Sequence, residues 1–301
     1  MISKHEELAG DGGQYYYFGA RHDTNYLLRS IAHSTVLVLD PEENWQNIRA
    51  YPGPFGNDGG QHHNWPHHNG AVADADAWER DRELYDIADI FSFEDKGGYL
   101  YLAGDLTRSY SQKKLKSFTR QIVYLRPGTF VIFDRVVATN PSYAKTWQLQ
   151  AVKPAEQAGD FLRTTNDKGG RLFLQALLPR ESRITQKTGD ELYRYDGESY
   201  APEEIRGPAP ESRISISPSS PAKQDLFLNI LTATDSNVDR PLVAHCEESD
   251  DAIIVKIGED SIEFTIARPG GRIEVKGTER ELTEQILAGG QKDPPPRKNR
   301  D

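Results

Sequence analysis

Ten short runs rich in β-branched and aromatic residues constrain the fold of this chain more than any other feature. Gly, Pro, Asn or Asp residues separate most of them, as is typical of strands joined by turns. Runs at this spacing along 301 residues predict an all-β fold, a large antiparallel β-sandwich with long loops. The runs are Thr35–Leu39, Gly98–Ala103, Thr119–Leu125, Thr129–Val137, Thr146–Val152, Arg171–Leu177, Asp225–Thr232, Ala252–Ile257, Ser261–Ala267 and Arg272–Val275.

Turn residues predict two hairpins within this pattern. Pro127 and Gly128 suit a tight turn, because Pro presets φ and Gly accepts a positive φ. A second hairpin is expected around Glu259. The segments Asp81–Ile87 and Arg280–Leu287 are expected to be helical.

The remaining segments are expected to be loops or a tail. Long loops are predicted over Pro41–Ala77, Thr185–Pro210 and Asp235–Arg240. The Pro- and Gly-rich segment Gly289–Asp301 is expected to be disordered. The chain is therefore interpreted as one sandwich domain over residues 1–288 followed by a tail.

Composition excludes several classes of partner. The formal net charge of −10 argues against nucleic acid, because no basic patch dominates. No apolar run reaches the roughly 18 residues that a membrane helix needs. The single cysteine, Cys246, excludes an internal disulfide and a cysteine zinc cage, and we expect it to be structural.

The segment Asn25–Asp40, NYLLRSIAHSTVLVLD, contains the first candidate functional residues. His33 directly precedes a strand-like run, and its pKa lies near the working pH of most enzymes. Arg29 can bind a carboxylate or sulfate through two parallel hydrogen bonds, and Tyr26 can line a cleft. The alternatives are a buried histidine at a strand entry, and packing or surface solvation for Arg29 and Tyr26.

A second candidate segment, Asn57–Asn69, packs four of the eight histidines and Asp58 into the run NDGGQHHNWPHHN. Histidine and aspartate are ligands that zinc accepts. The same run also fits a solvated loop that binds metal adventitiously. Together the two segments indicate one edge of an active site.

Several motifs resemble the heparinase II/III-like polysaccharide lyases and follow the order that this family shows. They are LAGDGGQYYYFG, HDTNYLLRSIAHSTVLVLDP, NDGGQ, YLAGDLTRSY, FTRQIVYLRPGTFVIFDRV and KTWQLQ. The family combines an N-terminal α/α toroid with a C-terminal β-sandwich. The resemblance implies that this chain is the sandwich portion of a longer lyase, with the toroid as its intramolecular partner.

The resemblance also implies an activity, a carbon–oxygen lyase that cleaves uronic-acid-containing polysaccharides by β-elimination. The substrate would be a glycosaminoglycan, an alginate-like glycan or another acidic polysaccharide. His33 would be the catalytic residue, with Tyr26 and Arg29 binding the substrate. Asp58, His33 and His62 would hold a structural zinc ion, without an organic cofactor, and the parent protein would be periplasmic or secreted.

Two other interpretations remain open. The chain can be a non-catalytic β-sandwich that binds or supports carbohydrate without cleaving it. It can also be a cupin-like metal enzyme, which requires ligands on adjacent strands, whereas His62 and His68 lie in a loop-like Gly/Pro/Asn segment.

Overall fold

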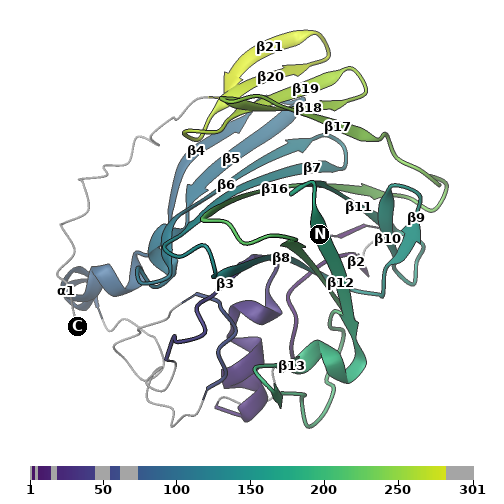
Figure 1. Ribbon diagram of the computed structural model, residues 1–301. Coiled ribbons are helices and arrows are strands. Elements are labelled where there is room, and N and C mark those ends of the chain that lie inside the picture. Colours follow the sequence, from purple (N-terminus) through teal and green to yellow (C-terminus); the bar gives the residue numbers. More distant parts are fainter. Residues whose placement is uncertain (1, 4–5, 15–18, 45–54, 62–73, 283–301) are drawn as a thin grey trace.

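Three stacked antiparallel β-sheets form most of the described part of the molecule, and two two-stranded pairs accompany them (Figure 1). The computed structural model describes residues 2–3, 6–14, 19–44, 55–61 and 74–282. The predicted all-β sandwich is confirmed. The expected tail, Gly289–Asp301, and the domain boundary at residue 288 lie outside the described residues.

The central sheet has eight strands and separates the two smaller sheets. Its strand order is β4 (Asp89–Asp95), β5 (Tyr99–Asp105), β6 (Leu115–Leu125), β7 (Thr129–Ala138), β16 (Gln224–Thr234), β11 (Arg171–Leu178), β10 (Phe161–Thr165) and β9 (Glu156–Ala158).

A four-stranded sheet packs on one face of the central sheet and a five-stranded sheet on the other (Figure 1). The four-stranded sheet has the order β12 (Ser182–Thr188), β15 (Ser212–Pro218), β8 (Ala144–Ala151) and β3 (Val36–Leu39). The five-stranded sheet has the order β17 (Ala244–Glu248), β18 (Ala252–Ile257), β19 (Asp260–Thr265), β20 (Gly271–Val275) and β21 (Thr278–Leu282).

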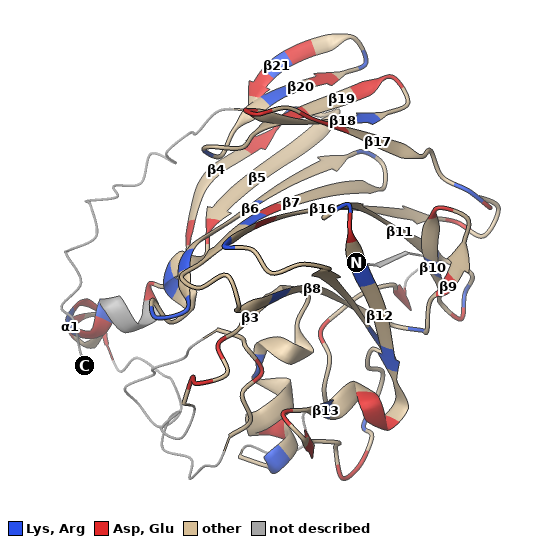
Figure 2. Ribbon diagram, viewed as in Figure 1, with Lys and Arg blue, Asp and Glu red and all other residues tan. Residues whose placement is uncertain are grey.

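Alternation along β7 shows why the central sheet supports a hydrophobic core on each face. Successive side chains of a strand point to opposite faces. Val131 and Phe133 face the five-stranded sheet, where the Phe133 ring stacks on Phe264 with 5.0 Å between centroids. Val136 faces the other way and packs in a cluster with Trp147 of β8. In Figure 2 the strands at the centre of the large sheet are mostly uncharged.

Short elements complete the described part of the chain. The α-helix α1 covers Ala75–Tyr85, and no helix in the described residues is long and apolar enough to cross a membrane. The others are a π-helix, η1 (Asp23–Leu27), three 3₁₀ helices, η2 (Ser30–Ala32), η3 (Thr107–Ser109) and η4 (Gly189–Tyr193), and the strand pairs β1 (Ile2–Ser3) with β2 (Glu6–Glu7) and β13 (Arg194–Tyr195) with β14 (Glu198–Ser199).

All ten predicted strands and both predicted hairpins are present, with shifted boundaries for most strands. β6 and β7 are joined at Arg126–Gly128, and β18 and β19 are joined at Gly258–Glu259. The absence of a strand or helix over Asp235–Arg240 confirms that loop.

Several other local predictions are wrong in their bounds or in the type of element. The helix expected over Asp81–Ile87 begins earlier, because the Asp74 carboxylate caps it by accepting from the Ala77 amide at 2.8 Å. Arg280–Leu282 pairs with β20 as strand β21, whereas the rest of the expected helix lies outside the described residues. The expected loop Thr185–Pro210 contains the end of β12, η4, β13 and β14. β12 is an exposed edge strand, so no hydrophobic alternation marks it.

Candidate functional site

The loop that carries His33 is held on the outer face of the four-stranded sheet. Trp147 of β8 faces the central sheet, so Gln148 and Gln150 point the other way. The Gln148 amide donates to the carbonyls of Ser30 at 2.6 Å and His33 at 2.8 Å. The Gln150 amide donates to the Ile31 carbonyl at 2.9 Å. Strand alternation in β8 therefore fixes where residues 30–33 lie.

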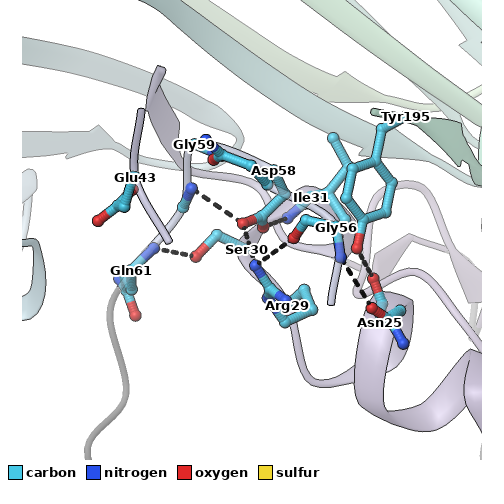
Figure 3. Close-up of polar contacts among 12 residues, drawn as sticks. Asn25, Arg29, Ser30, Ile31, Glu43, Gly56, Asp58, Gly59, Gln61 and Tyr195 are labelled. Carbon is cyan, nitrogen blue, oxygen red and sulfur yellow. Dashed lines mark hydrogen bonds and ion pairs between the residues drawn. The ribbon is translucent and has the colours of Figure 1, made fainter. Parts of the chain in front are cut away.

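Arg29 and Asp58 meet in a buried ion pair at the centre of this region (Figure 3). Arg29 Nη2 donates to Asp58 Oδ1 at 2.7 Å and to the Gly56 carbonyl at 3.0 Å. Asp58 Oδ1 also accepts from the Gly60 amide at 3.1 Å, and Oδ2 accepts from the Ile31 amide at 3.0 Å. The side chains are 3% and 0% exposed, so the carboxylate is satisfied entirely from inside the protein.

The glycines of the NDGGQ motif allow this close packing. Gly59 has φ of +72°, a conformation that side chains rarely adopt. A Cβ atom on Gly60 would lie 2.4 Å from Ser30 Cβ, and Ser30 Oγ accepts from the Gln61 amide at 2.8 Å. Asp58 is thus presented on a backbone turn that lies directly against residues 29–31.

A second buried cation holds the other side of the same turn. Lys114 Nζ donates to the Gly60 carbonyl at 2.7 Å and lies 2.5 Å from Glu43 Oε2. The Lys114 side chain is 0% exposed, and burial lowers its pKa although Glu43 opposes that change. Sequence reasoning missed Lys114, because one lysine in the run QKKLK has no local signal of burial.

Tyr26 lies in a packed aromatic cluster. It is 0% exposed, and its ring contacts His22 and Tyr193 with centroids 5.4 Å and 5.0 Å apart. Burial raises the pKa of Tyr26 to about 12, so the phenol stays neutral near pH 7. Packing is therefore the role that the structure shows for Tyr26, and its substrate contact stays a prediction.

Among the described members of the predicted set, His33 is the exposed one, with a side chain that is 40% exposed. Its Nδ1 lies 2.9 Å from Asp11 Oδ1 and its Nε2 lies 3.1 Å from the Leu27 carbonyl. Both partners accept hydrogen bonds, so both contacts are made together only when each ring nitrogen carries a proton. Both ring nitrogens of His33 therefore face hydrogen-bond acceptors.

His22 has the opposite environment and was missed by the sequence analysis. It is 2% exposed, its Nδ1 donates to the Tyr200 carbonyl at 2.6 Å, and its Nε2 accepts from the Gln14 amide at 2.9 Å. An acceptor nitrogen requires the neutral ring, and burial lowers the pKa of His22. Its partner Tyr200 is 178 positions away, so no local pattern marks it.

The described residues do not fit a zinc ion at Asp58. Arg29 already supplies the positive charge there, and both carboxylate oxygens accept from protein groups. No group of three or more His, Cys, Asp or Glu side chains is placed to hold a metal among the residues that the structure describes. His62 lies outside those residues, so the set Asp58, His33 and His62 stays a prediction.

The structure therefore brings Arg29 and Asp58 together and places Tyr26 and His33 on the same segment. Two other acidic residues, Asp134 and Asp105, have structural partners. Asp134 forms a bidentate pair with Arg120, with 2.7 Å between Asp134 Oδ1 and Arg120 Nε. Asp105 accepts from the Thr107 amide at 2.8 Å.

Solved structures of polysaccharide lyases share this fold. A heparinase III structure superposes on 87% of the chain with a TM-score of 0.56 at 16% identity, and its lysine-methylated form superposes on 87% with a TM-score of 0.51 at 15% identity. A heparan sulfate lyase mutant from Pedobacter heparinus has a TM-score of 0.42 over 59% of the chain at 15% identity. No protein-family model matches the sequence, and no curated protein is similar to it.

The chain spans 35% of the heparinase III chain and 34% of its methylated form. At these identities the likeness concerns the fold alone. The chain thus has a heparinase-like β-sandwich fold, which confirms the fold part of the resemblance seen in the sequence.

Proposed function

We propose that this chain is the β-sandwich portion of a polysaccharide lyase acting on a uronic-acid-containing polysaccharide, such as a glycosaminoglycan or an alginate-like glycan. The match of 87% of the chain to a heparinase III fold supports this most directly. A second domain, an α/α toroid in the same parent protein, would complete the cleft. The parent would act in the periplasm or outside the cell.

The chemistry of β-elimination defines what the site must supply. A base takes the C5 proton of the uronate, the electron pair forms a C4–C5 double bond, and the C4–O bond breaks as the leaving oxygen gains a proton. The negative charge that develops is shared with the C6 carboxylate, so a positive donor beside that carboxylate stabilises the transition state.

His33 is suited to this donor role. Its two ring nitrogens both face acceptors, so when both carry protons the ring would keep both contacts and would supply a positive donor to a carboxylate. Asp11 is 74% exposed and its carboxylate lies at Nδ1, the position that a substrate carboxylate would take. A substrate would displace Asp11 at little cost, because exposed ion pairs contribute about 0–1 kcal/mol.

The test compares His33→Gln with His245→Gln, a matched change at an exposed histidine on β17. The unsaturated uronate product is followed by its ultraviolet absorbance, with this chain and with its parent protein, on a panel of acidic polysaccharides. We expect His33→Gln to lower kcat/KM by about 100-fold, the usual effect of removing one charge-stabilising donor. A parent protein that forms no unsaturated product on any of these substrates would refute the lyase proposal.

A non-catalytic, carbohydrate-binding sandwich is the second candidate. One observation favours it: Tyr26 and Arg29, both predicted to bind substrate, are 0% and 3% exposed. Binding of uronate polysaccharides by the parent protein without product formation would select this candidate. Absence of both binding and cleavage would exclude the two candidates together.

A further inference from the structure

A pocket where β6 begins and β7 ends lies outside the predicted site. Its volume is about 460 Å³, within the range of about 300–1,000 Å³ that small-molecule sites occupy. Leu115, Val137 and Ala138 supply apolar surface, and Lys116, Lys223 and Thr107 are among the polar residues of its lining.

The two lysines flank the end of β7 from opposite sides. Lys116 lies on β6 and Lys223 directly precedes β16, and both strands neighbour β7 (Figure 1). Strands lie about 4.8 Å apart, so about 10 Å separates the two backbones, enough for a sugar ring with an anionic group. The Ala138 amide donates to the Lys223 carbonyl at 2.7 Å, which fixes that side of the pocket.

A β-bulge determines how Lys116 is presented. Leu115 pairs with Ala138 and Ser117 pairs with Val137, so Lys116 is the extra residue between two paired positions. Bulges redirect side chains and are frequent beside functional sites.

Two lysines give this pocket local positive charge in an acidic protein. The chain has 46 acidic and 36 basic residues, and many of its cations form ion pairs. Neither Lys116 nor Lys223 pairs with a carboxylate in the part of the chain that the structure describes. At physiological salt the net charge is screened beyond about 8 Å, so two unpaired ammonium groups attract an anion locally.

The hydrogen-bonding groups that line the pocket also suit a sugar ligand. Thr107 Oγ1 accepts from the Phe118 amide at 3.0 Å, which leaves its hydroxyl proton for a ligand oxygen. The apolar side chains suit the C–H face of a sugar ring. We propose that this pocket binds an acidic saccharide unit, a sugar that carries a carboxylate or a sulfate. This site is independent of the proposed lyase activity.

The test is calorimetric titration of the chain with four probes, namely a uronate disaccharide, its sulfated counterpart, a neutral disaccharide and inorganic sulfate. We expect the two acidic disaccharides to bind and the neutral one not to bind. Lys116→Gln and Lys223→Gln should each weaken binding about tenfold, the usual effect of losing one charge-assisted hydrogen bond. Lys113→Gln is the control, because Lys113 is exposed, outside the pocket lining and carries the same charge.

Thermal melting of each variant separates a loss of binding from a loss of folding. Binding that is equal in the Lys116→Gln, Lys223→Gln and Lys113→Gln variants would overturn the proposal. Equal affinity for sulfate and the sulfated disaccharide would overturn its saccharide part. Failure of the His33 test leaves these outcomes unaffected, because none of them measures cleavage.

Discussion

At the scale of single residues, the ion pair between Arg29 and Asp58 decides what this region can do. Sequence reasoning assigned Arg29 to substrate and Asp58 to a metal, whereas in the folded chain each is the other's partner. Removing one member of a buried pair leaves an uncompensated charge, which costs far more than the pair itself contributes.

Arg29→Met and Asp58→Asn should therefore each lower the free energy of unfolding by about 3–5 kcal/mol. The double variant should lose less than the sum, because the second change removes the charge that the first exposed. Urea denaturation measures all three. Arg21→Met is the control, since the exposed pair of Arg21 with Glu198 contributes about 0–1 kcal/mol. A loss in the double variant that equals the sum of the two single losses would contradict an energetic coupling between Arg29 and Asp58.

The hydrogen bonds of Asp58 also predict how much zinc the chain binds. Because Arg29 and two backbone amides satisfy Asp58, we expect elemental analysis to find less than stoichiometric zinc in the wild-type chain. A chelator should leave the melting temperature unchanged. Stoichiometric zinc that disappears in Asp58→Asn would instead show that the metal displaces Arg29.

His22 predicts a dependence of stability on pH. Burial lowers its pKa below the ordinary value of about 6.5, so the unfolded chain takes up a proton more readily than the folded chain. The stability from the neutral ring is complete above about pH 6.5 and is lost as the pH falls through the lowered pKa.

We expect His22→Gln to flatten the decline of melting temperature between about pH 7.5 and 5, relative to wild type. Because carboxylates also titrate at the acidic end, the difference between the two profiles is the quantity to measure. His245→Gln, at an exposed histidine, should leave the profile unchanged. A decline of melting temperature in His22→Gln that is as steep as in the wild type would contradict the assignment of a neutral, buried ring to His22 in the folded chain.

At the scale of elements, β8 connects the hydrophobic core to the loop that carries His33. Its core-facing residues pack between the sheets, and its outward glutamines hold residues 30–33 by their carbonyls. The position of His33 therefore depends on a strand more than 100 residues away.

Gln148→Met should loosen this loop without unfolding the sheet. It removes two hydrogen bonds and leaves two carbonyls without that partner. This should lower the free energy of unfolding by about 1–3 kcal/mol. Hydrogen exchange at the His33 amide, which donates to the Ser30 carbonyl, should speed up. Gln157→Met, at an exposed position of β9, serves as the control. Unchanged exchange at His33 would show that other contacts hold the loop.

At the scale of the whole molecule, the central sheet carries two separate cores. The five-stranded sheet, formed by the contiguous segment 244–282, packs on one face through residues such as Phe264. The site region lies beyond the four-stranded sheet, on the opposite side (Figure 1). A substitution that destabilises one core should affect the other core only through the central sheet.

Phe264→Ala should lower the free energy of unfolding by about 3–5 kcal/mol, because it leaves a cavity beside Phe133. Amide exchange should rise in β18 and β19 more than in β8 if the five-stranded sheet opens first. Phe93→Ala on the edge strand β4 is the control, since Phe93 is 44% exposed. Equal increases in β8 and β18 would show instead that the two cores unfold as one unit.

Local sequence patterns account for the strands and hairpins that the sequence analysis predicted correctly. Ten strands and two hairpins follow from residue alternation and turn chemistry, which act over a few neighbouring positions. β12 and β21 were missed because edge strands with exposed faces carry no apolar alternation. At the candidate site, the sequence analysis assigned Arg29 and Asp58 separate partners, whereas the two side chains pair with each other.

The sequence by itself determined that this chain forms a large antiparallel β-sandwich, since the period of its side chains defines buried and exposed faces. Tertiary structure alone decided which charges meet. Arg29 lies 29 positions from Asp58 and His22 lies 178 from Tyr200, and no local pattern encodes such contacts. Burial of a charge or a ring nitrogen depends on what packs over it, and that is settled only when the sheets and loops come together.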